Sequence, residues 1–376
     1  MKKTLAALAV LGAFAGSAMA ADVTLYGAVD TGFEYIHTKS TGEKGVDTFD
    51  MQTGWDTPSR WGLKGSEDLG NGYKVSFKLE SGFNSDDGTM GQSNRLFGRE
   101  AGLTLSGPFG SVAFGRFGGI SSSAGTYDML GYVESFDGGD GNVWGFASSS
   151  RYDNMVVYQT PRFAGLQLTA QYSFKTDTKE GDTVGADNKP QYNGDEGTSH
   201  AQRYASVGLS GEYGPASFAV GYELTKYGAN TNGARALDKD GQLVFVGGNY
   251  DFEVVQLFAE AQYFKHQTAI NAGDDATAEL GLGKLGLKGY GLHLGAAAPL
   301  AGGTLTAGLY YVDLSEEAVD QADEDAKYYG VSARYNYPLS ERTSLYAGAG
   351  YGQLKDDDSG NKDQLTQVYC GLVHTF

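Results

Sequence analysis

Apolar and polar residues alternate with a period of two along most of this chain. In residues 166–172, Leu, Leu, Ala and Tyr share one face, while Gln, Thr and Gln share the other. The same alternation recurs in residues 205–210, 255–263, 304–311 and 344–351. Successive side chains of a strand point to opposite faces, so a period of two indicates β-strands rather than helices.

The composition of the two faces indicates where these strands lie. The polar faces consist mostly of Gly, Ser, Thr, Gln and Tyr with few charges, whereas the solvated face of a soluble sandwich would carry Lys, Glu and Asp freely. Many of the apolar faces end in Tyr or Phe, as expected for the aromatic girdles at the two membrane interfaces. The pattern therefore favours strands that have lipid on one side and water on the other.

Short turns alternate with long, polar, acidic connections. The short turns fall at residues 68–72, 107–110, 161–165, 214–216, 249–253, 300–303 and 339–343. The long connections lie near residues 37–55, 84–94, 117–150, 176–201, 227–240, 266–284, 314–326 and 354–363. Seven turns and eight loops connect sixteen strands of roughly 10 residues each. We predict an all-β, transmembrane, antiparallel up-and-down β-barrel, whose last strand, residues 364–376, pairs with the first because lipid cannot satisfy an open sheet edge.

The first residues have the features of an export signal. Lys2 and Lys3 precede an apolar run over residues 5–16, and Ala18 and Ala20 give the small-x-small pattern of a cleavage site. The run is shorter than the roughly 20 residues that a membrane-spanning helix needs. We predict a cleaved signal peptide at residues 1–20 and one barrel domain at residues 21–376.

The overall composition agrees with this fold class. Of the 376 residues, 57 are Gly and 25 are Tyr, but 7 are Pro, and the mean hydropathy is slightly negative. The formal charge of −18, or −20 without the two lysines of the signal peptide, argues against nucleic acid as a partner. The one cysteine, Cys370, excludes an internal disulfide and falls on the lipid-facing side of the last strand.

Several motifs together resemble the trimeric general porins of Gram-negative outer membranes. They are residues 23–27 (VTLYG), 59–70 (SRWGLKGSEDLG), 78–83 (KLESGF), 110–116 (GSVAFGR) and 151–154 (RYDN), with Phe376 and His374 at the end of the chain. The resemblance covers the whole mature chain. It implies a homotrimer in the outer membrane, among lipid and lipopolysaccharide, and Phe376 as the C-terminal signal for the barrel-assembly machinery.

A sixteen-stranded barrel is too wide to filter solutes without a constriction. The longest connection, residues 117–150, carries the apolar residues Met129, Leu130, Val133 and Phe136. The resemblance implies that this third loop folds into the lumen and sets carboxylates against basic residues of the wall. The acidic candidates are Asp128, Glu134 and Asp137. Residues 134–140 resemble the loop-tip motif with a shifted acidic residue, so which carboxylate lines the pore stays open.

The basic candidates are Arg60, Lys64, Arg99 and Arg151. If Trp61 and Leu63 face lipid, the alternation turns Arg60 and Lys64 toward the lumen. Strict alternation would put Arg99 on the lipid side, which costs about 2–4 kcal/mol near the bilayer midplane. We therefore expect a β-bulge near Gly98 or Gly102 that turns this arginine inward. Lys74, Lys78 and Glu80 also point inward.

Arg116 has the outward parity of its strand, so we expect it at the subunit interface or anchoring a loop.

The function that these features indicate is passive diffusion of ions and small hydrophilic solutes, without a cofactor, a metal or catalysis. Acidic clusters such as Asp356 to Asp358 and Asp274 with Asp275 lack the ligand spacing of a calcium loop and are interpreted as solvated loop tips. A sugar-specific channel is the alternative, because Tyr310, Tyr328 and Tyr346 face inward. A barrel lipase or an adhesin has less support, and ion preference stays open.

Overall fold

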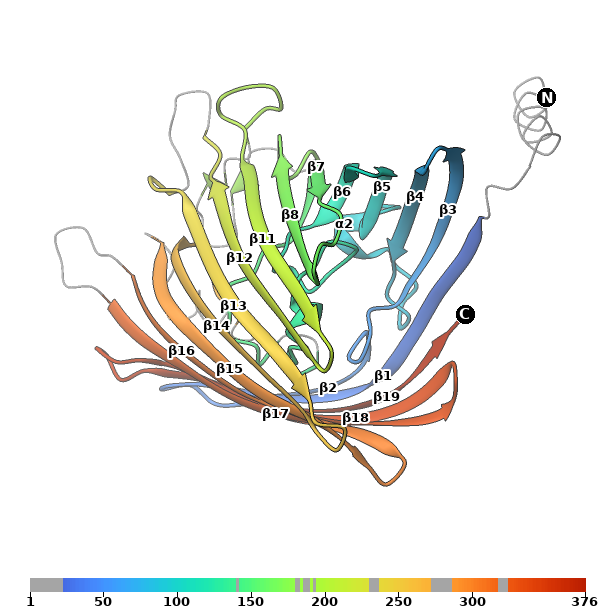
Figure 1. The fold of residues 1–376 in the computed structure, drawn as a ribbon. Coiled ribbons are helices and arrows are strands. Elements are labelled where there is room, and N and C mark those ends of the chain that lie inside the picture. The colour runs from blue at the N-terminus through green and yellow to red at the C-terminus, as the bar shows by residue number, and fades with distance from the viewer. Residues whose placement is uncertain are drawn as a thin grey trace, which may run out of the picture.

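The computed structural model describes residues 23–139, 142–179, 183–184, 190–191, 194–229, 237–271, 286–316 and 324–376. The predicted signal peptide at residues 1–20 lies outside them, as do Asp274 and Asp275. The strands form one ring (Figure 1). Its members are β1 (Thr24–Ser40), β3 (Arg60–Gly70), β4 (Tyr73–Gly82), β5 (Glu100–Gly107), β6 (Gly110–Gly118), β7 (Arg151–Gln159), β8 (Leu166–Ser173), β11 (Arg203–Tyr213), β12 (Ala216–Lys226), β13 (Gly241–Asp251), β14 (Gln256–Gln267), β15 (Leu287–Leu300), β16 (Gly303–Glu316), β17 (Glu324–Ser340), β18 (Thr343–Asp356) and β19 (Lys362–Thr375).

These sixteen strands pair antiparallel, each with its neighbours along the chain, and the ring closes where β1 pairs with β19. Beyond the last paired residue, the Phe376 N–H donates to the Gly27 carbonyl, and the Gly27 N–H donates to the Phe376 carbonyl, both at 3.0 Å. Closure leaves no long open edge for lipid to meet. The predicted sixteen-stranded barrel is confirmed.

The first long connection contains a strand that the sequence pattern did not predict. β2 (Val46–Thr53) pairs with the upper half of β1, from Thr31 to Thr38, while β3 pairs with β1 from Thr24 to Ala28. β1 is 17 residues long and outreaches β3, so its upper edge would otherwise expose unpaired backbone groups. The connection after β2, residues 54–59, then turns back into the barrel.

The seven predicted turns all join neighbouring strands. Gly72 and Gly302 have φ angles of 81° and 89°, which side chains other than glycine adopt at a cost. The strands from β15 to β19 have 14 to 17 residues and exceed the expected ten. They therefore extend beyond the apolar belt.

Two short elements complete the described secondary structure of the loops: the turn α2 (Gly91–Asn94) and the 3₁₀ turn η1 (Leu130–Tyr132), besides a two-residue pair, β9 (Thr183–Val184) and β10 (Pro190–Gln191). Within the described ranges, no helix has the length and apolar character needed to cross a membrane.

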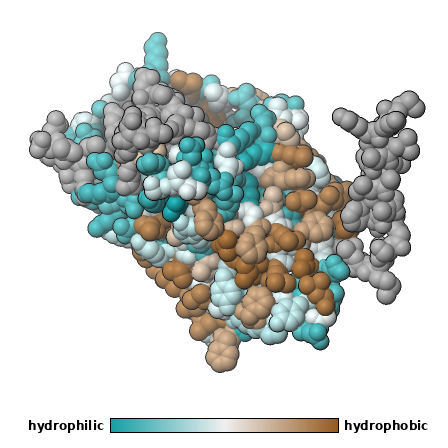
Figure 2. Space-filling model, turned by 90° about the horizontal axis from the view of Figure 1, so that it is seen from above, coloured by the Kyte–Doolittle hydropathy of each residue, from teal (hydrophilic) through white to brown (hydrophobic). Residues whose placement is uncertain are grey.

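The outward face of the ring is apolar, and its aromatic residues lie at two levels. Exposed Tyr and Phe occur at the turn ends of strands and in the turns themselves: Tyr73, Phe109, Phe163, Tyr213, Tyr250 and Tyr337. A second exposed set lies nearer the loop ends: Phe33, Phe174, Tyr222, Tyr263, Tyr290 and Tyr329. Exposed aliphatic side chains, among them Val246, Leu294 and Leu309, lie between the two sets. Figure 2 shows a broad hydrophobic area next to a hydrophilic one, the division expected of a barrel in a bilayer.

The inward face of the ring is polar, as the alternation predicts. Thr169 and Gln171 are buried while Leu168 is exposed, and Glu260 and Gln262 are buried while Tyr263 is exposed. Cys370 is exposed on the outward face, as expected.

Candidate functional site

The loop between β6 and β7, residues 119–150 and here named L3, runs through the interior of the ring (Figure 1). Its apolar side chains are buried against the inner wall, as predicted for Met129, Leu130, Val133 and Phe136. Burying one such side chain stabilises the structure by about 1.5–3 kcal/mol. The sequence therefore places L3 inside the barrel by giving it an apolar side of its own.

Hydrogen bonds from the wall fix the path of L3. Side chains of several strands contribute. Tyr204 (β11) accepts from the Ile120 N–H at 3.2 Å, and Asn249 (β13) donates to the Tyr132 carbonyl at 2.9 Å. Tyr310 (β16) donates to the Phe136 carbonyl, and Gln367 and Tyr369 (β19) donate to the Gly138 carbonyl at 2.9 and 2.8 Å. Backbone groups of a buried loop need such partners. The loop is held at several points rather than hanging free.

An aromatic cluster supports the far side of L3. The ring of Trp144 lies 5.0 Å from the imidazole of His293 and 4.9 Å from the ring of Phe146, and His293 stacks on Tyr310 at 4.7 Å. The Phe136 N–H donates to His293 Nε2 at 3.3 Å. Tyr310 and Tyr328 are buried beneath L3, and Tyr346 donates to Asp30 at 2.6 Å. These tyrosines face inward as expected, but Tyr310 and Tyr328 lie beneath L3 and Tyr346 bonds Asp30, so the three do not form an exposed aromatic row.

The basic candidates meet in one hollow of about 470 Å³, here named the basic hollow. Arg60, Lys64, Arg99 and Arg151 all line it, together with Lys78 and Glu80 of β4 and residues 123–126 of L3. Arg60 and Lys64 share one face of β3, and both line the hollow, so both point inward as predicted. The structure thus brings together all four predicted basic residues.

The cations of the basic hollow differ in their partners. Arg99 donates through Nε to Glu80 Oε1 at 2.8 Å, and Lys78 forms ion pairs with Glu80 at 3.5 Å and with Glu100. Arg60, by contrast, donates to Thr57 Oγ1 and the Pro58 carbonyl at 3.0 Å, and Lys64 lies 5.1 Å from the centre of the Tyr26 ring. The Nε of Arg151 is buried without a hydrogen-bond partner in the described structure. Three cations thus face the hollow without a carboxylate pair among the described residues.

The expected β-bulge that would turn Arg99 inward is wrong. β5 begins at Glu100, and its register with β4 and with β6 runs without a shift through Gly102. Arg99 belongs to the segment before the strand, where pleat alternation does not apply, and so reaches Glu80. The register shift near this point lies between β6 and β7, where Gly115 pairs with Met155 and Phe117 pairs with Tyr152.

Arg116 anchors a loop, one of the two roles expected for it. Its Nη1 donates to Asp153 Oδ1 at 2.6 Å and its Nε donates to the Gly98 carbonyl at 2.7 Å.

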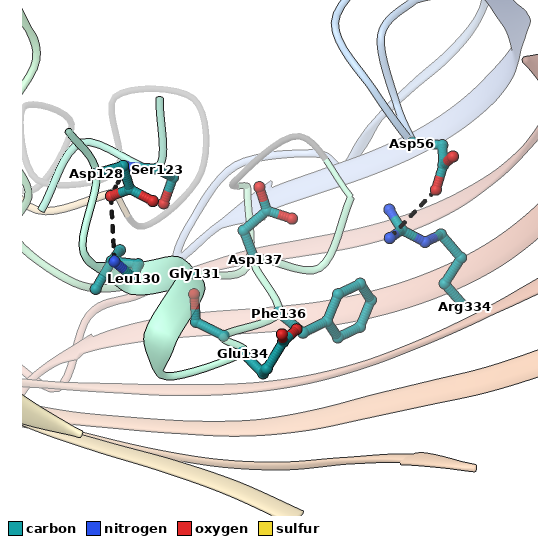
Figure 3. A pocket seen from close by; sticks show the side chains of 10 residues that line it. Asp56, Ser123, Asp128, Leu130, Gly131, Glu134, Phe136, Asp137 and Arg334 are labelled. Carbon is teal, nitrogen blue, oxygen red and sulfur yellow. Dashed lines mark hydrogen bonds and ion pairs between the residues drawn. The ribbon is translucent and has the colours of Figure 1, made fainter. Parts of the chain in front are cut away.

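The acidic candidates meet in a second hollow of about 230 Å³, here named the acidic hollow (Figure 3). Asp128, Glu134 and Asp137 line it with Asp56 of the first loop and Arg334 of β17. Asp128 Oδ1 accepts from the Ser123 and Leu130 N–H groups at 3.1 and 3.3 Å. Burial raises the pKa of Asp128 to about 6, although these backbone hydrogen bonds oppose the shift. Burial also raises the pKa of Asp137 and of Glu134.

Two residues of the acidic hollow were missing from the candidates. Arg334 pairs with Asp56 at 3.2 Å, donates to the Trp55 carbonyl at 3.3 Å, and lies 5.1 Å over the ring of Phe136. The parity of Arg334 contained the signal, since it shares the inward face of β17 with Tyr328. Asp56 lies in a loop with no periodic pattern, so the sequence contained no comparable signal for it.

Carboxylate clusters among the described residues do not assemble a metal site. Within those ranges, no group of three or more His, Cys, Asp and Glu side chains is placed to hold an ion. Asp356 instead accepts hydrogen bonds from the Asp358 and Ser359 N–H groups in its own turn, at 2.8 and 3.0 Å.

A closed sixteen-stranded barrel with an apolar outer belt, an inward polar face and a loop across its lumen defines an outer-membrane channel. Similarity to known proteins specifies the family. The family model described as Gram-negative porin matches residues 6–358. The chain therefore belongs to the Gram-negative porins, which are channels and not enzymes, and its location is the outer membrane.

Individual relatives agree with this family. The chain is 34% identical to an outer membrane porin protein of Bordetella pertussis over 410 aligned positions that cover 100% of both chains. It is 31% identical to outer membrane porin protein 32 of Delftia acidovorans, with 99% of this chain and 95% of the relative covered. Among solved structures, it resembles an anion-selective porin from Comamonas acidovorans with a TM-score of 0.68 and 25% identity, over 94% of this chain and 99% of the other.

Proposed function

We propose that ions and small hydrophilic solutes cross this porin by passive diffusion through a charged constriction, in which the carboxylates of L3 face the basic wall. The observation that carries the proposal is that all predicted basic residues line one hollow and all predicted acidic residues line an adjacent one. Opposite charges on two sides of a passage create a field across it, which orients polar solutes and biases ion passage.

The arrangement favours anions. Arg60, Lys64 and Arg151 have no carboxylate pair in the described part of the chain, and a guanidinium stays charged at every accessible pH. On the opposite side, Arg334 lies among the carboxylates and pairs with Asp56 at 3.2 Å, so the acidic hollow contains a positive charge of its own. The structurally similar porin from Comamonas acidovorans is likewise described as anion-selective.

The active form that we propose is a homotrimer set among lipid and lipopolysaccharide. A solved Vibrio cholerae outer membrane protein, OmpT, is described as a trimer form. In this chain, β1 presents Leu25, Val29 and Phe33 outward, and the Phe33 ring stacks on Phe49 of β2 at 5.9 Å. Phe376, which closes the ring against Gly27, is the proposed signal for the barrel-assembly machinery.

Single-channel conductance in a planar lipid bilayer tests the proposed pore. We expect open channels that close in three equal steps, since each subunit of a trimer holds its own lumen. Liposome swelling with neutral sugars of increasing size then gives the size limit. Folded barrels that carry no current and admit no sugar would overturn the proposal and indicate a plugged barrel.

The sugar-specific alternative predicts a saturable sugar flux. The burial of Tyr310 and Tyr328 beneath L3 removes the aromatic row that such a channel would need.

A further inference from the structure

One residue of L3 touches every hollow described for the lumen. Ser123 lines the acidic hollow and the basic hollow. It also lines a third hollow of about 400 Å³, which Asp56 and Asp137 share with Gln92 of the second loop. Figure 3 shows Ser123 beside Asp128 at the edge of the acidic hollow. A side chain at the junction of three hollows, two of them opposite in charge, lies where their contents meet.

A positive φ angle and several hydrogen bonds define the backbone turn at Ser123. Ser123 has a φ angle of +51°, in the left-handed region that residues with a side chain seldom adopt. Its N–H donates to Asp128 Oδ1 at 3.1 Å, and the neighbouring Ser122 hydroxyl bonds the Gly119 and Ala124 carbonyls at 2.7 and 3.1 Å. These bonds hold a strained turn in place, a feature that clusters at functional positions.

The side chain of Ser123 is small, neutral and open to the lumen. Ser123 is exposed although its neighbours Ser121 and Ala124 are buried. Its hydroxyl makes no hydrogen bond within the described residues, whereas that of Ser122 is used twice inside the turn. The turn therefore aims one hydroxymethyl group into the space between fixed charges of opposite sign.

We propose that Ser123 limits the size of the solutes that pass where the three hollows meet, and that its neutral side chain leaves the field there to the fixed charges on either side. The inference rests on the proposed channel function and assigns a specificity-determining position to it. A larger side chain at position 123 narrows the passage, and a charged one adds its charge where both hollows begin. Because Ser is neutral, Arg60 and Arg151 on one side and Asp128 on the other determine the field.

Thiol labelling at position 123 tests the proposal. All variants carry Cys370→Ala, since Cys370 is the one cysteine of the sequence and faces outward. Ser123→Cys is treated in the bilayer with sulfonatoethyl methanethiosulfonate, which attaches a negative group, or with the trimethylammonioethyl reagent, which attaches a positive one. We expect both reagents to lower the single-channel conductance. The negative group shifts the reversal potential toward cation preference and the positive group toward anion preference.

Ser340→Cys is the matched control, because Ser340 is an exposed serine at the turn end of β17 and lines none of the three hollows. Its labelling is expected to change neither conductance nor reversal potential. Ser123→Asp and Ser123→Lys introduce the two charges genetically and keep the test available if the cysteine variant does not fold.

Three outcomes separate the possibilities. Labelled Ser123→Cys channels with unchanged conductance and reversal potential would overturn the role of Ser123, and so would a thiol that the reagents fail to reach in open channels. A Cys370→Ala parent that folds but never conducts would instead overturn the proposed channel function.

Discussion

The two charged hollows of the lumen are built in different ways. The basic hollow takes its cations from the wall, with Arg60 and Lys64 on β3 and Arg151 at the start of β7. The acidic hollow takes its carboxylates from loops, with Asp128, Glu134 and Asp137 on L3. Sheet hydrogen bonds fix the position of a wall residue, whereas a loop residue depends on anchors such as Tyr310. The wall thus provides a fixed charge, and the loop provides one that anchoring and pH can change.

Removing the unpaired wall charges is expected to have the largest effect. In Arg60→Ala with Arg151→Ala, the basic hollow loses two cations while the acidic hollow keeps its carboxylates. We expect the reversal potential in a salt gradient to change sign from anion to cation preference. Arg342→Ala, at an exposed turn outside the lumen, is the control. An unchanged reversal potential in the double variant would show that ions do not pass the basic hollow.

Arg334 tests how the acidic side is held. Arg334→Ala removes the one cation that lines the acidic hollow and releases Asp56 and Phe136. We expect a shift toward cations and a loss of about 1.5–3 kcal/mol of stability, typical of hydrogen bonds to a charged group. Reversal potentials and the heat-induced mobility shift on gels measure the two effects. Compared with Arg334→Ala, Arg334→Lys keeps the positive charge but lacks the planar guanidinium group that contacts Asp56, the Trp55 carbonyl and the Phe136 ring. We therefore expect it to restore ion selectivity more fully than stability. Equal recovery of selectivity and stability would show that these guanidinium contacts do not contribute.

Acidification should neutralise carboxyls of L3 and leave the guanidinium groups of the basic hollow charged. Burial raises the pKa of Asp128 to about 6, so this carboxyl is charged at pH 8 and neutral at pH 5. We expect anion preference to increase as the pH falls between these values. The change should be smaller in Asp128→Asn, which is neutral throughout. A titration of the same size in that variant would assign the effect to other carboxyls.

Loss of one loop anchor is expected to have the smallest effect. Tyr310→Phe removes the hydroxyl that donates to the Phe136 carbonyl, which contributes about 0.5–1.5 kcal/mol. Current noise should increase and closure should occur at a lower voltage, with selectivity unchanged. Tyr335→Phe is the control, because the Tyr335 hydroxyl donates to the Leu300 carbonyl at 2.9 Å near a turn rather than to L3. Equal noise in both variants would argue against anchoring by Tyr310.

The same contrast explains how much the sequence alone could predict. A period of two determines which side of a strand each residue faces, so the barrel, its turns and the inward direction of Arg60 and Lys64 followed from the pattern. Arg334 has an inward parity too and was available to the same reasoning. Strand rules do not apply to Arg99, which lies one residue before its strand begins, and the bulge inferred from them is wrong.

The periodic pattern of apolar and polar residues does not predict the geometry of loops. The burial of L3 was predicted from a family resemblance and from the apolar residues of the loop. The ion pair between Asp56 and Arg334 depends on where the first loop returns to the wall, which no sequence pattern indicates. β2 was missed because its pairing follows from the unequal lengths of β1 and β3.

Whether the wall cations or the loop carboxylates dominate the field is measured by the zero-current potential of the unmodified protein across a bilayer with a salt gradient at pH 7.5. We expect an open pore whose potential has the sign of anion preference, because Arg60, Lys64 and Arg151 have no carboxylate partner among the described residues, whereas Arg334 lies among the carboxylates of the acidic hollow. A potential with the sign of cation preference would contradict this expectation, since the loop would then dominate the field.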